Sequence, residues 1–237
     1  MKTSFILIVF ILFTLPTFAQ HKTLTLYYPN DSINVVSITD LDSMSFFICG
    51  ASKVNYGGKD YNTVLIGNQC WLKENLNIGT MSSPSNNGQI EKFCYDNDTV
   101  NCTTYGGLYY WDEAMQYVTT VGARGICPEG WHMPTYAEFQ TLANFVNNNG
   151  NELKREDQGT GAGLGTNTSG FSALIAGAKQ YAGGPFIGMG EFTNYWMGEP
   201  GTGSYACNFQ IIGNDTTIYL WNNGIKSWGL SVRCIRN

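Results

Sequence analysis

The chain has 237 residues, of which 43% are hydrophobic and 13% charged, with a net charge of −5 at pH 7. Charged residues are about half as frequent as in an average folded domain, and 28 glycines indicate many loops. No basic run is present, so nucleic-acid binding and binding to anionic membranes are disfavoured, and the hydrophobic fraction excludes a disordered chain.

Residues 1–19 are predicted to be a secretory signal peptide. Lys2 supplies a positive charge, residues 5–15 form an apolar segment, and small residues mark a cleavage site before Gln20. The apolar segment is shorter than the ~20 residues of a membrane span, and no later run is apolar enough to cross a bilayer. We therefore expect an exported protein, secreted or at the outer cell surface, with no membrane span after signal removal.

A small β module is expected over residues 20–49, followed by a linker over residues 50–60. Alternating leucines and threonines predict a strand that ends at Tyr27, and residues 33–38 predict a second strand after a turn. Residues 45–49 predict a third strand, which completes the module.

The main domain is expected over residues 61–237, with an α+β fold of few helices, short antiparallel strands and long loops. Its clearest helix covers residues 135–147, because Thr135 and Glu138 form a capping box and apolar residues follow at helical spacing. A shorter helix is predicted over residues 112–118. The predicted strands are 61–66, 171–176, 192–197, 206–212, 216–221 and 230–235.

All seven cysteines lie beyond the predicted signal peptide, which indicates disulfides formed in an oxidising compartment. No CxxC pair is present, so we expect no zinc ribbon and no thioredoxin-type site. The odd number leaves at least one thiol unpaired or available to another chain, and Cys49 in the small module is the candidate. Cys70–Cys207 is a candidate pair.

Two further disulfides are predicted from the surroundings of the cysteines. Cys94 and Cys102 bracket a short polar loop, so that local closure is easy. Cys127 and Cys234 each lie in an apolar motif, and a bond between them would fasten the C-terminal strand to the start of the long helix. Such a bond would close a long loop and would therefore stabilise the fold strongly.

Six motifs follow one another along the main domain. They are VLIGNQCWLKENL (64–76), CYDND (94–98), YGGLYYW (105–111), GICPEGWHMPT (125–135), GFSAL (170–174) and SVRCIR (231–236). In this order they resemble the Fibrobacter succinogenes major paralogous domain family of exported proteins from Bacteroidetes and Fibrobacteres. The chain departs from the family at residues 195–200, where an aromatic-Trp-Ser-Ser stretch is usual, and near Cys207, where a bulky apolar residue is usual.

The resemblance implies export, disulfides and a fold similar to C-type lectin-like and formylglycine-generating-enzyme-like domains. It implies no established activity. Enzymes with that fold use a reactive cysteine pair near the C-terminus, and the nearest candidates here are Cys207 and Cys234. Because Cys234 is more plausible as a structural cysteine, we do not expect that chemistry.

Neither a catalytic site nor a cofactor is expected. The chain has two histidines, His21 and His132, and no nucleophile elbow or Cys–His motif accompanies them. Too few metal-ligating residues surround His132 for a zinc site. We expect His132 to anchor the turn into the long helix through hydrogen bonds, and we predict that the protein is not an enzyme.

Two segments resemble incomplete versions of the calcium motifs of C-type lectins. They are Gly-Glu-Pro at 198–200 and Trp-Asn-Asn at 221–223. Calcium prefers about six to eight oxygen ligands, among them several carboxylates. Glu199 and Asn222 would supply one carboxylate and one amide, so that a site built on them would bind calcium weakly.

Exposed aromatic residues in the last third of the chain are the stronger binding feature. Tyr205 and Trp221 lie beside Gly- and Asn-rich loops and are expected at the surface, whereas Trp196 and Trp228 are expected to be buried. Flat rings stack on the C–H faces of sugars, and amides hydrogen-bond to their hydroxyls. The predicted ligand-binding residues are Tyr205, Trp221, Asn222 and Asn223.

These observations predict a secreted or surface-exposed, non-catalytic module that binds a carbohydrate or a cell-surface protein. One alternative is a structural or adhesive surface component without a small ligand. Another is a binding protein whose loops over residues 194–228 vary between genomic copies.

Four Asp-Ser/Thr-apolar tripeptides resemble the O-glycosylation signal of exported Bacteroidetes proteins. Short patterns of this kind also recur by chance. The candidate sites are Ser32, Ser43, Thr99 and Thr216.

Overall fold

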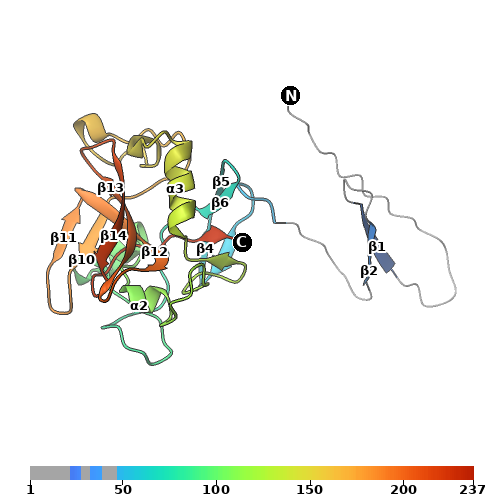
Figure 1. Ribbon diagram of the computed structural model, residues 1–237, viewed down its shortest axis with the longest axis horizontal. Helices are drawn as coiled ribbons and strands as arrows, with labels where there is room; N and C mark the ends of the chain where they lie inside the picture. The colour runs from blue at the N-terminus through green and yellow to red at the C-terminus, as the bar shows by residue number, and fades with distance from the viewer. Residues whose placement is uncertain (1–21, 28–32, 39–46) are drawn as a thin grey trace. The chain divides into compact units, whose positions relative to one another are not determined.

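The computed structural model describes residues 22–27, 33–38 and 47–237, and the chain divides into two units, residues 1–46 and 47–237. The first unit contains an antiparallel hairpin of β1 (Lys22–Tyr27) and β2 (Ile33–Ile38) (Figure 1). Both strands were predicted, and the structure confirms them. The predicted signal peptide and the candidate sites Ser32 and Ser43 lie outside the described residues.

The third strand predicted over residues 45–49 is absent from its described part, and the expected linker has structure of its own. Residues 47–49 form no strand, and the expected linker contains a hairpin of β3 (Val54–Tyr56) and β4 (Lys59–Tyr61). Its two-residue turn, Gly57 and Gly58, has φ of 58° and 78°, which is the left-handed backbone that tight hairpins require. Glycines that suggested a linker therefore close a hairpin within the second unit.

A small sheet joins distant parts of the second unit. Its strands, in spatial order, are β5 (Thr63–Ile66), β6 (Gln69–Leu72), β15 (Ile235–Arg236) and β9 (Trp131–His132). Ile235 pairs with Trp71 on one side and with His132 on the other, both antiparallel. The end of the chain is therefore held in the middle of this sheet.

A larger sheet of five strands forms the other half of the unit. Its strands, in spatial order, are β11 (Phe186–Met189), β10 (Ala176–Lys179), β12 (Phe192–Pro200), β13 (Tyr205–Ile212) and β14 (Ile218–Ile225). Neighbouring strands are antiparallel except β10 and β12, which are parallel. The strands predicted near 192, 206 and 216 are confirmed. Of the strand predicted at 230–235, only Ile235 lies in β15, and Leu230 and Ser231 form isolated bridges.

The strand predicted at 171–176 is not formed, apart from its last residue: Ser172 has a left-handed φ of 59°, and Ala173 makes only an isolated bridge with Lys154. The fully buried Arg233 guanidinium donates to the carbonyl of Phe171, which ties this segment to the C-terminal part of the chain. Remaining short elements connect the sheets. They are β7 (Thr80–Met81), β8 (Glu91–Lys92), α1 (Thr99–Tyr105), α2 (Trp111–Ala114) and the 3₁₀ turns Tyr95–Asn97, Gly150–Glu152 and Gly161–Gly163.

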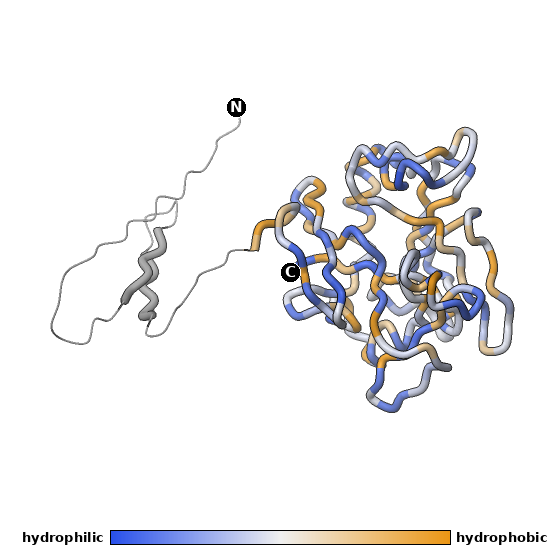
Figure 2. The backbone as a smooth tube through the Cα atoms, turned by 180° about the vertical axis from the view of Figure 1, so that it is seen from behind, coloured by the Kyte–Doolittle hydropathy of each residue, from blue (hydrophilic) through white to orange (hydrophobic). Residues whose placement is uncertain are grey.

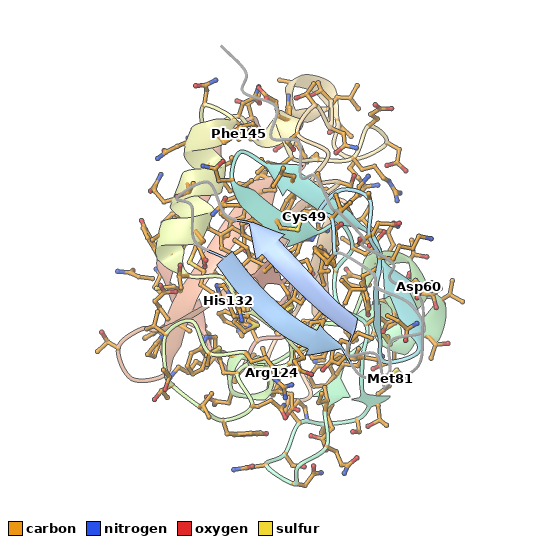
Figure 3. All side chains as sticks on the ribbon, turned by 90° about the vertical axis from the view of Figure 1, so that its right-hand side faces the viewer. Cys49, Asp60, Met81, Arg124, His132 and Phe145 are labelled. Carbon is orange, nitrogen blue, oxygen red and sulfur yellow. A yellow bond between two sulfur atoms is a disulfide. The ribbon has the colours of Figure 1, made fainter. Side chains whose placement is uncertain are left out.

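Helix α3 (Tyr136–Phe145) packs on one face of the larger sheet (Figure 1). The predicted capping box is present: Thr135 Oγ1 accepts from the Glu138 N–H, and the Glu138 carboxylate accepts from the Thr135 N–H. Phe139 is fully buried and stacks on Phe209 with ring centroids 4.5 Å apart. The helix ends at Phe145, which is 54% exposed (Figure 3).

The described chain is therefore α+β with few helices, as the sequence predicts. Hydrophobic and hydrophilic stretches alternate along the second unit (Figure 2), as expected for short elements that each bury one face. Among the described helices, none has the length and hydropathy that a bilayer crossing requires.

Candidate functional site

The two faces of strands β12, β13 and β14 differ in chemistry. One face carries Tyr195, Phe209 and Ile211, all fully buried in the cluster that contains α3. Because side chains alternate along a strand, the residues between them point to the opposite face. The register places Asn194 beside Gln210 on that face, and in the next rung Asn208 lies beside Trp221.

A pocket of about 340 Å³ opens on this second face, and we call it the amide–indole pocket. Its walls are amide, indole and aliphatic side chains, and no ionisable side chain is among the described residues that form them. The lining residues are Asn194, Asn208, Gln210, Trp221, Asn223, Gly224, Ile225, Trp228 and Leu230.

Two amides in this pocket belong to nearly buried residues and have no hydrogen-bond partner among the described residues. Asn194 is 6% exposed and Asn208 is 5% exposed, and neither side-chain amide hydrogen-bonds to another residue in the described part of the chain. Their amide atoms are not among the buried polar atoms that lack a partner, so they are reached from the pocket. An added Cβ at Gly224 would overlap the Asn208 amide, so glycine keeps that position open. Both amides are therefore available to groups that enter the pocket.

The ring of Trp221 is held in place at its edge and on one face. Its Nε1 donates to Gln210 Oε1 over 3.0 Å, and it stacks on Tyr219 with ring centroids 5.5 Å apart and an interplanar angle of 10°. The residue remains 41% exposed. A large flat ring fixed in this way loses little conformational freedom when a ligand packs on it.

The structure brings two of the four predicted ligand-binding residues to the pocket. Trp221 and Asn223 line it, whereas Tyr205 and Asn222 are exposed elsewhere on the surface. Asn222 and Asn223 lie in a β-bulge. Ala206 pairs with Gly224 and Asn208 with Trp221, so that Asn222 and Asn223 both stand opposite one residue of β13.

The two tryptophans that were expected to be buried differ in their exposure to solvent. Trp196 is fully buried, as predicted, and its Nε1 donates to the Tyr109 carbonyl over 2.7 Å. Trp228 is half-buried and lines the pocket, so its prediction was wrong. It follows the tight turn after β14, which places the ring at the pocket wall rather than inside the core.

Three pocket amides were missed by the sequence interpretation. Asn194, Asn208 and Gln210 occur within strands that are otherwise apolar, and they were counted as strand residues only. The available signal was their spacing, because Asn208 and Gln210 are two residues apart and must share a face. The register with Asn194 could not be derived from one sequence.

The disulfides confirm two predicted pairs and correct the third. Cys94–Cys102 and Cys127–Cys234 are bonded as predicted. The Cys70–Cys207 prediction was wrong, because Cys70 is bonded to Cys49, which lies in the second unit beside β5 and β6 (Figure 3). The unpaired thiol is Cys207, not Cys49. It is buried on the α3 face of the sheet, and burial raises the pKa of its thiol.

The weak calcium candidate does not form a cluster. Glu199 Oε1 accepts from the Tyr136 N–H over 2.8 Å at the start of α3, and strand β13 lies between the strands that carry Glu199 and Asn222. Within the described residues, no group of three His, Cys, Asp or Glu side chains is arranged to hold a metal ion. The glycosylation candidates Thr99 and Thr216 are both exposed, the first at the start of α1 and the second between β13 and β14.

His132 anchors the start of α3, as predicted. Its Nε2 lies 2.9 Å from Glu138 Oε1, and its Nδ1 lies 2.6 Å from Asn237 Oδ1. The hydrogen bond to Glu138 raises the pKa of His132. Burial acts to raise the pKa of Glu138, but the hydrogen bonds from His132 and Thr135 outweigh it and lower that pKa.

This pair makes stability depend on pH near neutrality. The pKa of His132 is higher in the folded protein than in the unfolded chain, where it is about 6.5. The contribution of His132 to the free energy of unfolding is therefore fully present below pH 6.5 and is lost as pH rises through the pKa of the folded protein. We expect His132→Gln to destabilise the protein by about 1 kcal/mol at pH 5.5 and by less at pH 8.5. Urea denaturation at both pH values measures this, with His21→Gln as the comparison. An equal loss at both values would show that the charged form of His132 contributes nothing.

The fold and the pocket define a disulfide-bonded α+β domain with an uncharged pocket on its larger sheet. The profile of the Fibrobacter succinogenes major domain matches residues 64–236, and the chain belongs to that family. No curated protein and no solved structure matched the chain. Three disulfides in a domain of this family indicate an extracellular location. The similarity to C-type lectin-like domains stays a prediction.

Proposed function

We propose that the protein is a secreted or cell-surface, non-catalytic module that binds neutral carbohydrate in the amide–indole pocket. The observation that carries this proposal is the composition of the pocket. Amides without a partner among the described residues lie beside the fixed Trp221 ring, and no ionisable group is among the described lining residues.

The chemistry of the pocket fits sugar hydroxyls and sugar C–H faces. A side-chain amide both donates and accepts hydrogen bonds, as a hydroxyl does, so Asn194 and Asn208 match either orientation of a hydroxyl. The exposed ring of Trp221 offers a flat apolar surface beside them. A charged ligand would lose its hydration here without gaining a charged partner, which disfavours it.

The same composition supports a binding role rather than catalysis. General acid–base catalysis needs a titratable group within hydrogen-bond reach of the reacting atoms. The amides and indoles of this pocket do not titrate near neutral pH. The alternative of a structural or adhesive component predicts no saturable binding of a small ligand.

We expect Trp221→Ala to weaken binding of a neutral oligosaccharide by about tenfold or more, because the variant removes the stacking surface and leaves the amides in place. Calorimetric titration with hexasaccharides of β-1,4-linked glucose, xylose and mannose measures the change. Tyr181→Ala is the matched control, since Tyr181 is 57% exposed and lies outside the pocket. Equal affinity of Trp221→Ala and wild type for a bound hexasaccharide would refute the assignment of the site.

A further inference from the structure

A tight turn separates the amide–indole pocket from a second cavity. The Trp228 N–H donates to the Ile225 carbonyl over 2.8 Å and closes this turn. Its outer residues, Ile225 and Trp228, line the amide–indole pocket, whereas its central residues, Lys226 and Ser227, line the second cavity. The two sites are therefore neighbours that share one wall.

The second cavity has a volume of about 520 Å³, and we call it the charged pocket. It lies between the loop that contains residues 84–86, helix α2 and the turn at Ser204. Unlike its neighbour, it is lined by ionisable side chains of both signs, Asp112, Glu113 and Lys226. Its volume is within the range of small-molecule sites, roughly 300–1,000 Å³.

Two opposite charges in this pocket belong to no ion pair in the part of the chain that the structure describes. Across residues 47–237 the side-chain ion pairs are His132–Glu138 and Arg155–Asp157, so neither Asp112 nor Lys226 belongs to one. The Lys226 ammonium lies 4.4 Å from the centroid of the Trp111 ring, which orients it by a cation–π contact. The pocket thus presents one available carboxylate and one available ammonium.

The walls of the pocket are held in place by hydrogen bonds to two buried carboxylates, Glu113 and Glu91. Glu113 is fully buried, and its carboxylate accepts from the Glu91 N–H over 3.1 Å and from the Tyr117 hydroxyl over 3.0 Å. Glu91 accepts in turn from the Ser85 N–H over 2.8 Å, which ties down the loop that forms one wall. The Tyr110 hydroxyl, shielded from solvent, has no hydrogen-bond partner among the described residues.

We propose that the charged pocket binds a free α-amino acid, with the ligand ammonium at Asp112 and the ligand carboxylate at Lys226. A simple anion would meet the carboxylates of Asp112 and Glu113, and a simple cation would meet Lys226. A neutral sugar would leave both available charges without a partner. A zwitterion satisfies both at once, and charge-assisted hydrogen bonds of this kind are stronger than neutral ones.

Ligand-observed NMR with pools of the common amino acids, followed by calorimetric titration of those that bind, tests this proposal on the chain without residues 1–19. We expect Asp112→Asn and Lys226→Met each to weaken binding about tenfold or more. Glu156→Gln and Lys53→Met make the same charge changes at exposed positions outside the pocket and are expected to bind as wild type does.

Blocked ligands test whether the pocket requires both charges of the amino acid. The N-acetyl and the amide derivatives of a binding amino acid each lack one charge and are expected to lose binding. Trp221→Ala is expected to bind the amino acid normally, so this result is independent of the saccharide proposal. The proposal is overturned if no amino acid binds, if the blocked derivatives bind equally well, or if Asp112→Asn and Lys226→Met have no effect.

Discussion

Replacing Cys127 and Cys234 together by alanine is expected to lower the free energy of unfolding by about 4–5 kcal/mol. The two residues are 107 positions apart, and their bond restricts the unfolded chain more than a bond across a short loop does. Both residues are fully buried next to the small sheet that holds the C-terminal strand. Urea denaturation without reductant measures the change.

The pair Cys94 and Cys102 provides the comparison within the same chain. It spans 8 positions, so removal of this bond is expected to cost about 2–3 kcal/mol by the same relation. If removal of Cys94–Cys102 lowered the free energy of unfolding as much as removal of Cys127–Cys234, or more, the account would be contradicted. The account holds that Cys127–Cys234 is the main constraint on the ends of the domain.

Phe139→Ala is expected to destabilise the protein by about 3–5 kcal/mol. Phe139 is fully buried between the two sheets, with its ring 4.5 Å from that of Phe209 and 5.1 Å from that of Trp71, measured between centroids. Truncation would leave a cavity that neighbours held in strands and a helix cannot refill. Thermal or urea denaturation of the variant gives the loss.

Phe145→Ala is the matched control, because it makes the same truncation on the same helix at a residue that is 54% exposed. We expect a loss of about 0.5 kcal/mol or less. Similar losses for the two variants would show that α3 is not packed on the larger sheet as described.

Features that depend on neighbouring residues could be predicted from the sequence. The capping box of Thr135 and Glu138, the disulfide across the Cys94 loop and the first two strands each follow from local patterns. The Cys127–Cys234 bond followed from two apolar motifs, although they are far apart in the chain.

Features that depend on tertiary placement could not be predicted from the sequence. Cys49 was assigned to the N-terminal module because it precedes a glycine-rich stretch, but that stretch forms a hairpin, and Cys49 reaches Cys70. Helix α1 was also missed, because its Thr- and Asn-rich sequence has little apolar periodicity and is stabilised by the cap at Asp98 and the disulfide at Cys102.

The candidate site was only partly predictable for the same reason. Trp221 and Asn223 were selected because exposed aromatic and amide residues suit a sugar. Asn194 and Asn208 belong to strands whose mostly apolar sequence predicts burial in the core. Only the register of β12 with β13 shows that both residues face the same pocket as Trp221.

Binding of the chain without residues 1–19 to an array of neutral and charged glycans, with calcium and again with a chelator, tests the central claim most directly. The account predicts binding to neutral glycans that the chelator does not change, because no carboxylate is among the described residues that line the amide–indole pocket. Binding that requires calcium, or no binding to neutral glycans in either condition, would contradict it.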